Sequence, residues 1–466
     1  MPGDAGSVMR QVFEPRSVAV VGVPRREGLG RRFLEALQSP GFRGDVYAVN
    51  PGADEILGVK CHPTVSAIGR PVEQAIVVAP PDAAPGIVAD CGRAGVSVAI
   101  MFVAGFDELH TPEGDARAAA LLAAAREGGV RMIGPNCMGV YSPAVGLGPF
   151  PGVPTEVGDT AFISQSGSLM SMFTRESTAR GYPASKAVSV GNQLDLQAAD
   201  FLDHLSDDAA TRVVGMYVEG ARDGRHFFDA LRATSARKPV VLWKSGRTEG
   251  GARAARSHTG ALTGSRYVWE AVARQAGAVV ARNAEQVIDL VVALHMRPAP
   301  AGRRIAIVTG PGGPGISAVD ALEEAGLALA RLAPGSIERL WAEINPVGTS
   351  PRNPIDVGLG GSLEAFERGA RIAAADPAVD GVVIIGGGGG GEGARRFAEA
   401  MVGAHRDARV PFAIATAMSG PAEASLQRRY VDAGIGVFPT ADRAVSAFAG
   451  AAAYARFRGE IGAPLD

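Results

Sequence analysis

One histidine stands in a setting that suits group transfer. His258 lies in the segment 247–265, which is rich in Gly, Ala, Ser and Thr and has neither helical nor strand periodicity, so we expect a surface loop. An imidazole is neutral and nucleophilic near pH 7, so a loop histidine can accept a phosphoryl group and carry it between sites. Most loop histidines are only solvated, and neighbouring motifs must decide between the two interpretations.

Two further motifs could serve a phosphorylated histidine. Ser166, Gly167 and Ser168 follow the apolar run TAFIS and open a helical pattern, so their hydroxyls and free backbone N–H groups would form an anion site at a helix N-terminus. Glu219 ends the run GMYVEG and is placed to orient an imidazole and fix its tautomer. Taken alone, Ser166 could be a hydrolase nucleophile, although SQSGS lacks the GxSxG spacing. Glu219 alone could be a solvated acid at a strand end.

A third motif is a glycine turn near the N-terminus. The apolar run SVAVV leads into Gly22, Gly28 and Gly30, a strand–turn–helix pattern whose N–H groups can hold a phosphate. The spacing is not GxGxxG, and the next strand ends in Asn50 and Pro51 instead of the acid that binds the ribose in a dinucleotide site. Four arginines flank the turn: Arg25, Arg26, Arg31 and Arg32. They favour a ligand with more phosphate charge, such as the 3′-phosphorylated ADP of coenzyme A (CoA); a structural turn with solvated arginines is the alternative.

The elements that must position these motifs form a repeating pattern. Short Val/Ile runs alternate with longer Ala/Leu/Glu/Arg stretches along the chain, which predicts parallel sheets covered by helices on both faces. Two Pro/Gly-rich segments, 141–158 and 297–302, interrupt the pattern. A length of 466 residues suits about three domains. We therefore expect an α/β fold with three consecutive doubly wound units, spanning 1–140, 141–297 and 303–466.

Composition excludes several classes of function. The formal net charge of −2 removes the general attraction for nucleic acid or anionic lipid that a strongly basic chain has. The three cysteines (Cys61, Cys91 and Cys137) form neither a CxxC pair nor an even framework, so we expect no disulfide scaffold and no metal site. The N-terminus lacks the apolar core of a signal peptide, and no apolar stretch is long enough to span a bilayer. A soluble, cytoplasmic enzyme without a GxxxxGK[ST] loop is the expectation.

Motifs along nearly the whole chain resemble one family, the nucleoside-diphosphate-forming (ADP-forming) acyl-CoA synthetases, which are related to the α subunit of succinyl-CoA synthetase. The matching segments, in chain order, are FEPRSVAVVG, IGPNCMGVYSP, ISQSGSL, VSVGNQLDLQAADFLDHLSDD, YVEGARDGRHF, SHTGALTGS, TGPGGPG and NPIDVG. The resemblance implies a Rossmann-like CoA-binding domain followed by a domain with the phosphohistidine loop and a third ligase domain, both flavodoxin-like.

The resemblance also implies roles for individual residues. His258 would be transiently phosphorylated, and Glu219 would orient it. The residues cradling the phosphate would be Ser166, Gly167 and Ser168. Those along CoA would be Gly22, Val23, Pro24, Arg25, Asn50 and Pro51. Those where acyl group, thioester and phosphate meet would be Asn136, Cys137 and Gly139. We interpret Cys137 as small packing near that junction, since nothing in the sequence indicates the lowered pKa of a nucleophile.

The reaction implied is the exchange of a carboxylic acid, CoA and ATP with acyl-CoA, ADP and phosphate, through an acyl phosphate and phospho-His258. Family members hold ATP and Mg²⁺ in an ATP-grasp portion, so we expect a separate β subunit in an α2β2 heterotetramer. A non-catalytic CoA-binding or regulatory protein of the same fold is the alternative, and Asn50 disfavours a nicotinamide-dependent oxidoreductase. The glycine run Gly386–Gly391 could approach a ligand or partner closely, although a flexible loop is the favoured interpretation.

Overall fold

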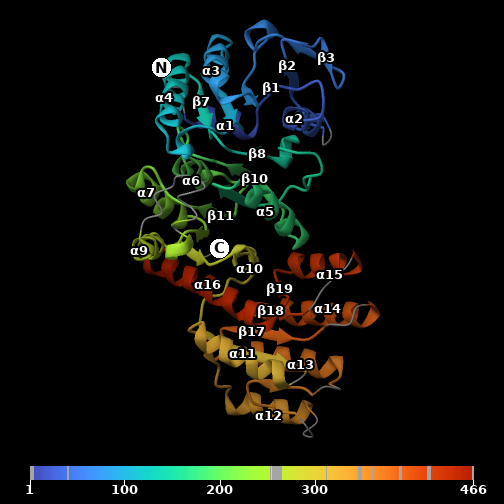
Figure 1. The fold of residues 1–466 in the computed structure, drawn as a ribbon. Coiled ribbons are helices and arrows are strands. Elements are labelled where there is room, and N and C mark those ends of the chain that lie inside the picture. Colours follow the sequence, from blue (N-terminus) through green and yellow to red (C-terminus); the bar gives the residue numbers. More distant parts are fainter. Residues whose placement is uncertain are drawn as a thin grey trace. The chain divides into compact units, whose positions relative to one another are not determined.

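The computed structural model describes residues 5–38, 41–251, 253, 265–310, 312–344, 349–358, 361–387, 391–416 and 421–463 (Figure 1). His258 and Gly388–Gly390 lie outside these residues. The chain divides into two compact units, one made of Met1–Thr178 and Tyr182–Val280, the other of Ala179–Gly181 and Ala281–Asp466. The first unit contains two sheets and the second contains one. Within the described residues, no helix combines the length and apolar character needed to cross a bilayer.

The first sheet has seven strands in the order β3-β4-β2-β1-β5-β6-β7, all parallel except the pair β3 and β4. The strands are β1 (Ser17–Val21), β2 (Asp45–Val49), β3 (Glu55–Ile56), β4 (Val59–His62), β5 (Gln74–Val77), β6 (Val98–Met101) and β7 (Arg131–Ile133). The helices are α1 (Ala5–Phe13), α2 (Leu29–Gln38), α3 (Ala84–Arg93) and α4 (Pro112–Gly128), with 3₁₀ turns η1 (Ser66–Ile68), η2 (Pro81–Ala83) and η3 (Asp107–Leu109).

Strand β1 shows why this sheet is doubly wound. Val18 and Val20 belong to the core that contains α1 and α2, whereas Ala19 and Val21 belong to the core that contains α3 and α4. Because successive side chains point to opposite faces, an all-apolar strand must be covered on both. The strand order reverses at β1, which has β2 on one side and β5 on the other. A ligand crevice is expected at the carboxyl ends of such strands.

The second sheet has the order β13-β12-β11-β9-β10-β8. Its strands are β8 (Gly139–Tyr141), β9 (Thr160–Ser164), β10 (Ala184–Ser189), β11 (Val213–Val218), β12 (Val240–Lys244) and β13 (Val279–Ala281). The other elements are η4 (Pro143–Val145), α5 (Gly167–Ala179), α6 (Ala198–Asp207), α7 (Gly224–Ser235) and α9 (Arg266–Ala276). Strands β10, β9, β11 and β12 run parallel in a flavodoxin-like order, and β8 joins β10 antiparallel.

The first two sheets share one apolar core. Val18 and Val20 of β1 fall in the same buried cluster as Val188 of β10 and Val214 of β11. Helix α1 reaches α6, where the Phe13 ring meets Phe201 edge to face at 6.0 Å. The first two predicted units therefore share a single hydrophobic core.

The third sheet has the order β15-β14-β17-β18-β19, with β16 paired to β14, and these strands pair in parallel. Its strands are β14 (Arg304–Thr309), β15 (Ala328–Leu329), β16 (Ile355–Asp356), β17 (Gly381–Ile385), β18 (Phe412–Ala415) and β19 (Gly436–Phe438). Its helices are α10 (Ala284–His295), α11 (Gly312–Glu324), α12 (Pro334–Glu343), α13 (Leu363–Ala374), α14 (Gly391–Arg406), α15 (Pro421–Asp432) and α16 (Ala441–Glu460). The predicted α/β fold with three doubly wound units is confirmed.

The border between the second and third units differs from the predicted limit at 297. Helix α10 groups with the C-terminal unit, which begins at Ala281. The buried Asp289 of α10 accepts hydrogen bonds from Arg443 of α16 at 2.6 and 2.9 Å, and Arg180 lies 3.4 Å away. A buried carboxylate needs such partners, so these ion pairs hold α10 against α16.

Candidate functional site

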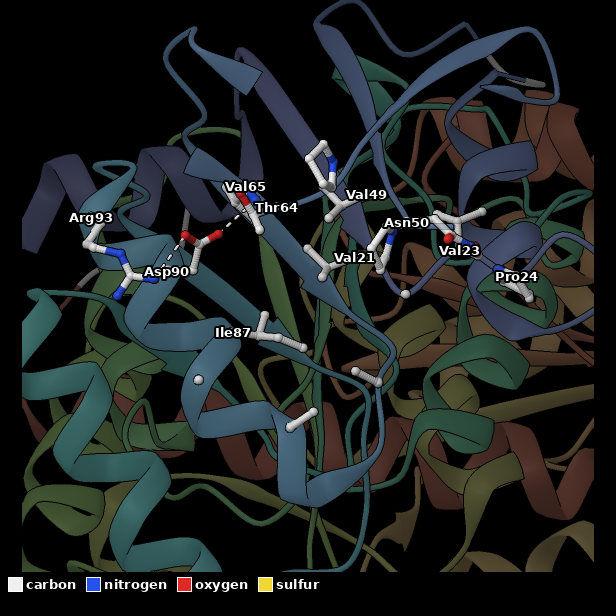
Figure 2. A pocket seen from close by; sticks show the side chains of 16 residues that line it. Val21, Val23, Pro24, Val49, Asn50, Thr64, Val65, Ile87, Asp90 and Arg93 are labelled. Atoms are coloured by element: carbon white, nitrogen blue, oxygen red, sulfur yellow. Dashed lines mark hydrogen bonds and ion pairs between the residues drawn. The ribbon is translucent and has the colours of Figure 1, made fainter. Parts of the chain in front are cut away.

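A cavity of about 480 Å³ opens at the carboxyl ends of β1 and β2, at the reversal point of the first sheet (Figure 2). Five of the six residues that the resemblance placed along CoA line it: Gly22, Val23, Pro24, Asn50 and Pro51. Arg25 does not line the cavity but stands at its rim, exposed, with a guanidinium nitrogen 3.7 Å from where a Cβ on Gly52 would lie. The glycine turn therefore does border a ligand-sized space.

Gly22 has a backbone path that a side chain would block. Its N–H donates to the carbonyl of Val49 at 3.0 Å, and its φ is +89°, in the left-handed region that favours glycine. A Cβ at this position would stand 2.0 Å from the carbonyl oxygen of Val78. The turn therefore passes tightly between the ends of β2 and β5 and exposes its backbone to the cavity.

Asn50 fixes the shape of this turn. Its Nδ2 donates to the carbonyl of Val23 at 2.6 Å, and its Oδ1 accepts from the N–H of Gly52 at 2.7 Å. Both ends of the amide are thus engaged by backbone. Asn50 occupies the place of the ribose-binding acid of dinucleotide sites, but here it braces the loop.

The opposite end of the cavity was not foreseen from the sequence. Figure 2 shows Asp90 and Arg93 of α3 across the lining from Asn50 and Pro24, with Val21, Val49 and Ile87 between them. Helix α3 follows β5, which lies on the other side of the reversal point from β2. A predicted strand order would therefore have indicated that α3 borders the ligand crevice.

Asp90 is a fixed anion at this end. It accepts from the N–H groups of Val65 and Ser66 at 2.8 and 3.2 Å and from Arg93 at 3.1 Å. Burial acts to raise the pKa of Asp90, but these bonds and the one from the Ser66 hydroxyl outweigh it and hold the pKa below its usual range. The cavity thus combines apolar walls with a backbone-lined turn at one end and an ion pair at the other.

Two of the four arginines at the turn have structural partners. Arg31 pairs with Glu35 one helical turn later at 3.3 Å, and Arg32 lies 5.3 Å from the centre of the Phe150 ring. Arg25 and Arg26 are exposed. The last two are the arginines of the turn best placed to meet a phosphate.

The serine turn forms at the end of β9, as the motif predicted. The Ser164 hydroxyl accepts from the N–H of Ser166 at 3.1 Å and donates to its carbonyl at 2.7 Å. The hydroxyls of Ser166 and Ser168 lie 3.1 Å apart, and α5 begins at Gly167. A Cβ on Gly167 would come 2.6 Å from Cβ of Met138. Two hydroxyls and the first N–H groups of α5 therefore meet at one point, as an anion site requires.

Glu219 lies at the same edge of the sheet. It is only 7% exposed, and its Oε1 accepts from the hydroxyl of Tyr217 at 3.0 Å. Burial raises the pKa of Tyr217 to about 12, so the phenol keeps its proton and remains a donor. Because β11 pairs with β9 and aligns Tyr217 with Ser164, the fold brings the carboxylate and the serine turn to neighbouring strand ends.

His258 lies outside the described residues, so its geometry relative to Glu219 stays a prediction. The described chain on either side is informative. Strand β12 ends at Lys244, which is aligned with Val218 of β11, and α9 begins at Arg266. The segment with His258 thus leaves the sheet next to the strand end that carries Glu219.

Lys244 is a buried cation that the sequence did not single out. It is 4% exposed, its Nζ donates to the carbonyl of Ser245, and it lies 5.2 Å from the centre of the Trp269 ring. Burial lowers the pKa of Lys244 to about 8; the nearby Glu219 opposes this shift and Arg247 adds to it. The ring of Trp269 supplies part of the compensation that a buried ammonium needs.

Replacing Lys244 by methionine is expected to remove a pH-dependent penalty on folding. Between pH 8 and 10.5 the unfolded chain holds a proton on this lysine that the folded chain has released, so the free energy of unfolding rises with pH in that window. The wild-type value minus the Lys244→Met value should increase by about 2 kcal/mol between about pH 7.5 and about pH 9.5 in urea titrations. Lys60→Met at an exposed position is the control; a difference that stays flat for Lys244 would contradict the assignment.

The three residues predicted at the acyl junction lie together where the first two sheets meet. Asn136 has a φ of +55°, and its Nδ2 is 3.5 Å from Oδ1 of Asn192. Gly139, with a φ of +94°, begins β8. The Cys137 thiol is buried within 3.5 Å of the carbonyls of Met101 and Ile133, and burial raises its pKa to about 12. A thiol with such a pKa is a poor nucleophile, in line with the packing role.

A polar cluster next to Asn136 joins the two sheets. Nδ2 of Asn192 donates to Asp107 at 2.9 Å and to Glu108 at 2.5 Å. Arg222 donates to the carbonyl of Asn192 at 2.8 Å and also pairs with Asp107. The sequence pointed to Asn192 within GNQLD, but its acidic partners on η3 were not foreseen, because they lie about 85 residues earlier in the chain.

Comparison with known families gives matches along the whole chain. Three family models match in succession: a CoA binding domain at residues 16–143, a succinyl-CoA ligase like flavodoxin domain at 157–294 and a ligase-CoA domain at 305–460. The second match includes α10, which packs with the third sheet.

Individual relatives of this chain are named as ADP-forming acetate–CoA ligases. The acetate–CoA ligase [ADP-forming] I subunit alpha of Pyrococcus furiosus is 34% identical over 450 residues, covering 94% of this chain and 96% of that protein. The acetate–CoA ligase [ADP-forming] I of Archaeoglobus fulgidus is 38% identical over 397 residues, covering 85% of this chain but only 57% of that protein. The chain thus spans little more than half the length of some curated relatives.

One solved structure matches over almost its full length. The dinucleotide forming acetyl-coenzyme A synthetase 1 of Ca. Korarchaeum cryptofilum, in complex with phosphate and ADP, superposes with a TM-score of 0.86 at 32% identity. The match covers 98% of this chain and 99% of that chain. Fold, domain order and sequence therefore agree with the same group of proteins.

Proposed function

Since the chain belongs to the family of ADP-forming acyl-CoA synthetases, we propose that it is the CoA-binding, phosphohistidine-carrying α subunit of such an enzyme. The observation that carries the proposal is the meeting of the serine turn with the buried Glu219 at one edge of the second sheet. An anion site beside a carboxylate is the arrangement that a phosphorylated imidazole needs.

The cavity on the first sheet is the proposed site for the nucleotide end of CoA. Its apolar walls suit an adenine ring, and the backbone of Gly22 and Val23 suits the diphosphate. Arg25, exposed at the rim, is available for the remaining phosphate charge. The CoA thiol is then directed toward Asn136 and Gly139, where the first two sheets meet.

The chemistry proceeds in three displacements. An oxygen of inorganic phosphate attacks the acyl-CoA carbonyl and expels the CoA thiolate, which leaves an acyl phosphate. A ring nitrogen of His258 then attacks the phosphorus and releases the carboxylate of the acid. Phospho-His258 gives its phosphoryl group to ADP, and synthesis of acyl-CoA runs the same steps in reverse. The hydroxyls and N–H groups of the serine turn stabilise the negative charge of the phosphoryl group, and Glu219 stabilises the positive charge that develops on the imidazole.

A second subunit completes this proposal. We place ATP, ADP and Mg²⁺ on an ATP-grasp β subunit, in an α2β2 assembly. Support comes from the relatives named as alpha subunits, which match this chain over most of their length. It also comes from the longer single-chain relatives, of which this chain covers 57% or less. The substrate of this enzyme is a carboxylic acid.

The proposal is tested by combining the chain with a matching ATP-grasp subunit. With γ-labelled ATP the chain should become phosphorylated on a bond that is labile in acid and stable in base. ADP release should depend on both CoA and a carboxylic acid, in a screen of short-chain, branched, aryl and dicarboxylic acids. Tight CoA binding without acid-dependent ADP release would instead indicate a non-catalytic CoA-binding protein and overturn the proposal.

A further inference from the structure

Gln165 lies between Ser164 and Ser166 at the start of the serine turn, and its side chain bonds to backbone on the neighbouring strand end. It is 7% exposed, and its Oε1 accepts hydrogen bonds from the backbone N–H groups of both Glu219 and Gly220, the latter at 3.0 Å. Its own N–H donates to the carbonyl of Tyr217 at 3.0 Å. One side chain from the serine turn therefore holds the backbone of the residue that carries the orienting carboxylate.

A second glutamine holds the same segment from the other side. Nε2 of Gln193 donates to the carbonyl of Gly220 at 3.3 Å, and its Oε1 accepts from the N–H of Ala198 at 2.8 Å. Gly220 is thus bonded through its N–H to Gln165 and through its carbonyl to Gln193. We call this pair of side chains, with the backbone of Gly220 between them, the glutamine clamp. It ties together the loops that follow β9, β10 and β11.

We infer that Gln165 is a positioning residue that ties the serine turn to the Glu219 backbone, so that the anion site and the orienting carboxylate keep one fixed distance. This inference rests on the proposed function, because it assigns Gln165 a task in phosphorylating His258. Glu219 and Gly220 are both buried, so without Gln165 their N–H groups lose an acceptor that water does not readily replace. The segment must then shift, and a displacement of about 1 Å at a transfer site can slow a reaction about 100-fold.

Two substitutions at position 165 test whether the acceptor oxygen of the Gln165 side chain is what matters. Gln165→Leu keeps the size of the side chain but removes the acceptor, so phosphorylation should slow by about 10- to 100-fold, with the Kd for CoA within about twofold of wild type because the cavity lies on another sheet. Gln165→Glu keeps an acceptor oxygen for both N–H groups and should restore most of the rate at high pH.

The glutamate variant also gives a signature in the pH profile. Its carboxylate would stand beside Glu219, and like charges raise the pKa of a carboxyl group. The acid limb of the phosphorylation rate should therefore move to higher pH in Gln165→Glu.

The matched control is Gln74→Leu. Gln74 is also a fully buried glutamine, and its Nε2 donates to the carbonyls of Gln11 and Val12 at 3.1 and 3.0 Å. It lies in β5 of the first sheet, so its loss should lower Tm while leaving the phosphorylation rate per folded molecule unchanged. A phosphorylation rate of Gln165→Leu within twofold of wild type, or an equal fall in Gln74→Leu, would overturn the inference.

Amide hydrogen exchange makes the clamp testable apart from activity. In wild type the amides of Glu219 and Gly220 should exchange slowly; in Gln165→Leu they should exchange at least about tenfold faster, and in Gln165→Glu they should stay protected. Unchanged protection in Gln165→Leu would refute the clamp whatever the enzyme does. Absence of phosphorylation in wild type, with protection lost in Gln165→Leu, would refute the proposed function while leaving the positioning of Glu219 established.

Discussion

Replacing His258 by alanine is expected to abolish acid-labile phosphorylation of the chain, lowering it by at least about three orders of magnitude. The imidazole is the phosphoryl acceptor in the proposed transfer, and the methyl group of alanine offers no nucleophile in its place. The measurement is incorporation of label from γ-labelled ATP in the presence of the partner subunit. Retention of label in His258→Ala would remove the phosphohistidine from the mechanism.

Four of the other six histidines lie in helices and are poor substitutes for His258. His295 and His405 are buried in helices α10 and α14, and His204 is half-buried on α6. Burial lowers the pKa of His405 to about 4. His226 on α7 has its Nε2 2.7 Å from Asp203. It is partly exposed, so His226→Ala is the matched control, and that variant should be labelled like wild type.

Replacing Gly22 by alanine is expected to weaken CoA binding by at least about 100-fold and to lower the free energy of unfolding by about 2–4 kcal/mol. Two effects combine. The φ of +89° is unfavourable for any residue with a side chain, and the new Cβ would stand 2.0 Å from the carbonyl oxygen of Val78, inside van der Waals contact. The turn must move away from β5, and its backbone then leaves the position that borders the cavity.

Titration calorimetry with CoA and urea denaturation measure the two parts of this prediction. Gly224→Ala is the control, because Gly224 begins α7 and an added Cβ there would have no atom within 4 Å. That variant should bind CoA like wild type. If Gly22→Ala bound CoA with unchanged affinity, the cavity at the reversal point would not be the CoA site.

The fold could be predicted because its information is local. Runs such as SVAVV and TAFIS are apolar on both faces, and only a sheet covered twice can bury them. The antiparallel strand β8 was beyond this reasoning, since its three residues carry no period that distinguishes a strand from a loop. The placement of α10 was also hidden, because an apolar helix does not reveal which sheet it covers.

Some residues of the candidate site could likewise be predicted from the sequence, and others could not. Gly22 and the serine turn were recognisable because a turn that exposes backbone needs particular residues at fixed spacing. Asp90, Lys244 and Gln165 escaped notice, since each has an ordinary sequence context and takes its meaning from partners on other strands or loops. Arg25, which the resemblance placed along CoA, stands outside the lining, because a sequence match does not tell where a long side chain points.

The core common to the first two sheets has a thermodynamic consequence. Because Val20 of β1 and Val214 of β11 lie in one buried cluster, we expect the two sheets to unfold together. A ligand held at the first sheet therefore stabilises the second by mass action, with no relay of atomic movements between them. The binding energy that retains CoA therefore also protects the strand ends with Glu219 and the serine turn against global unfolding.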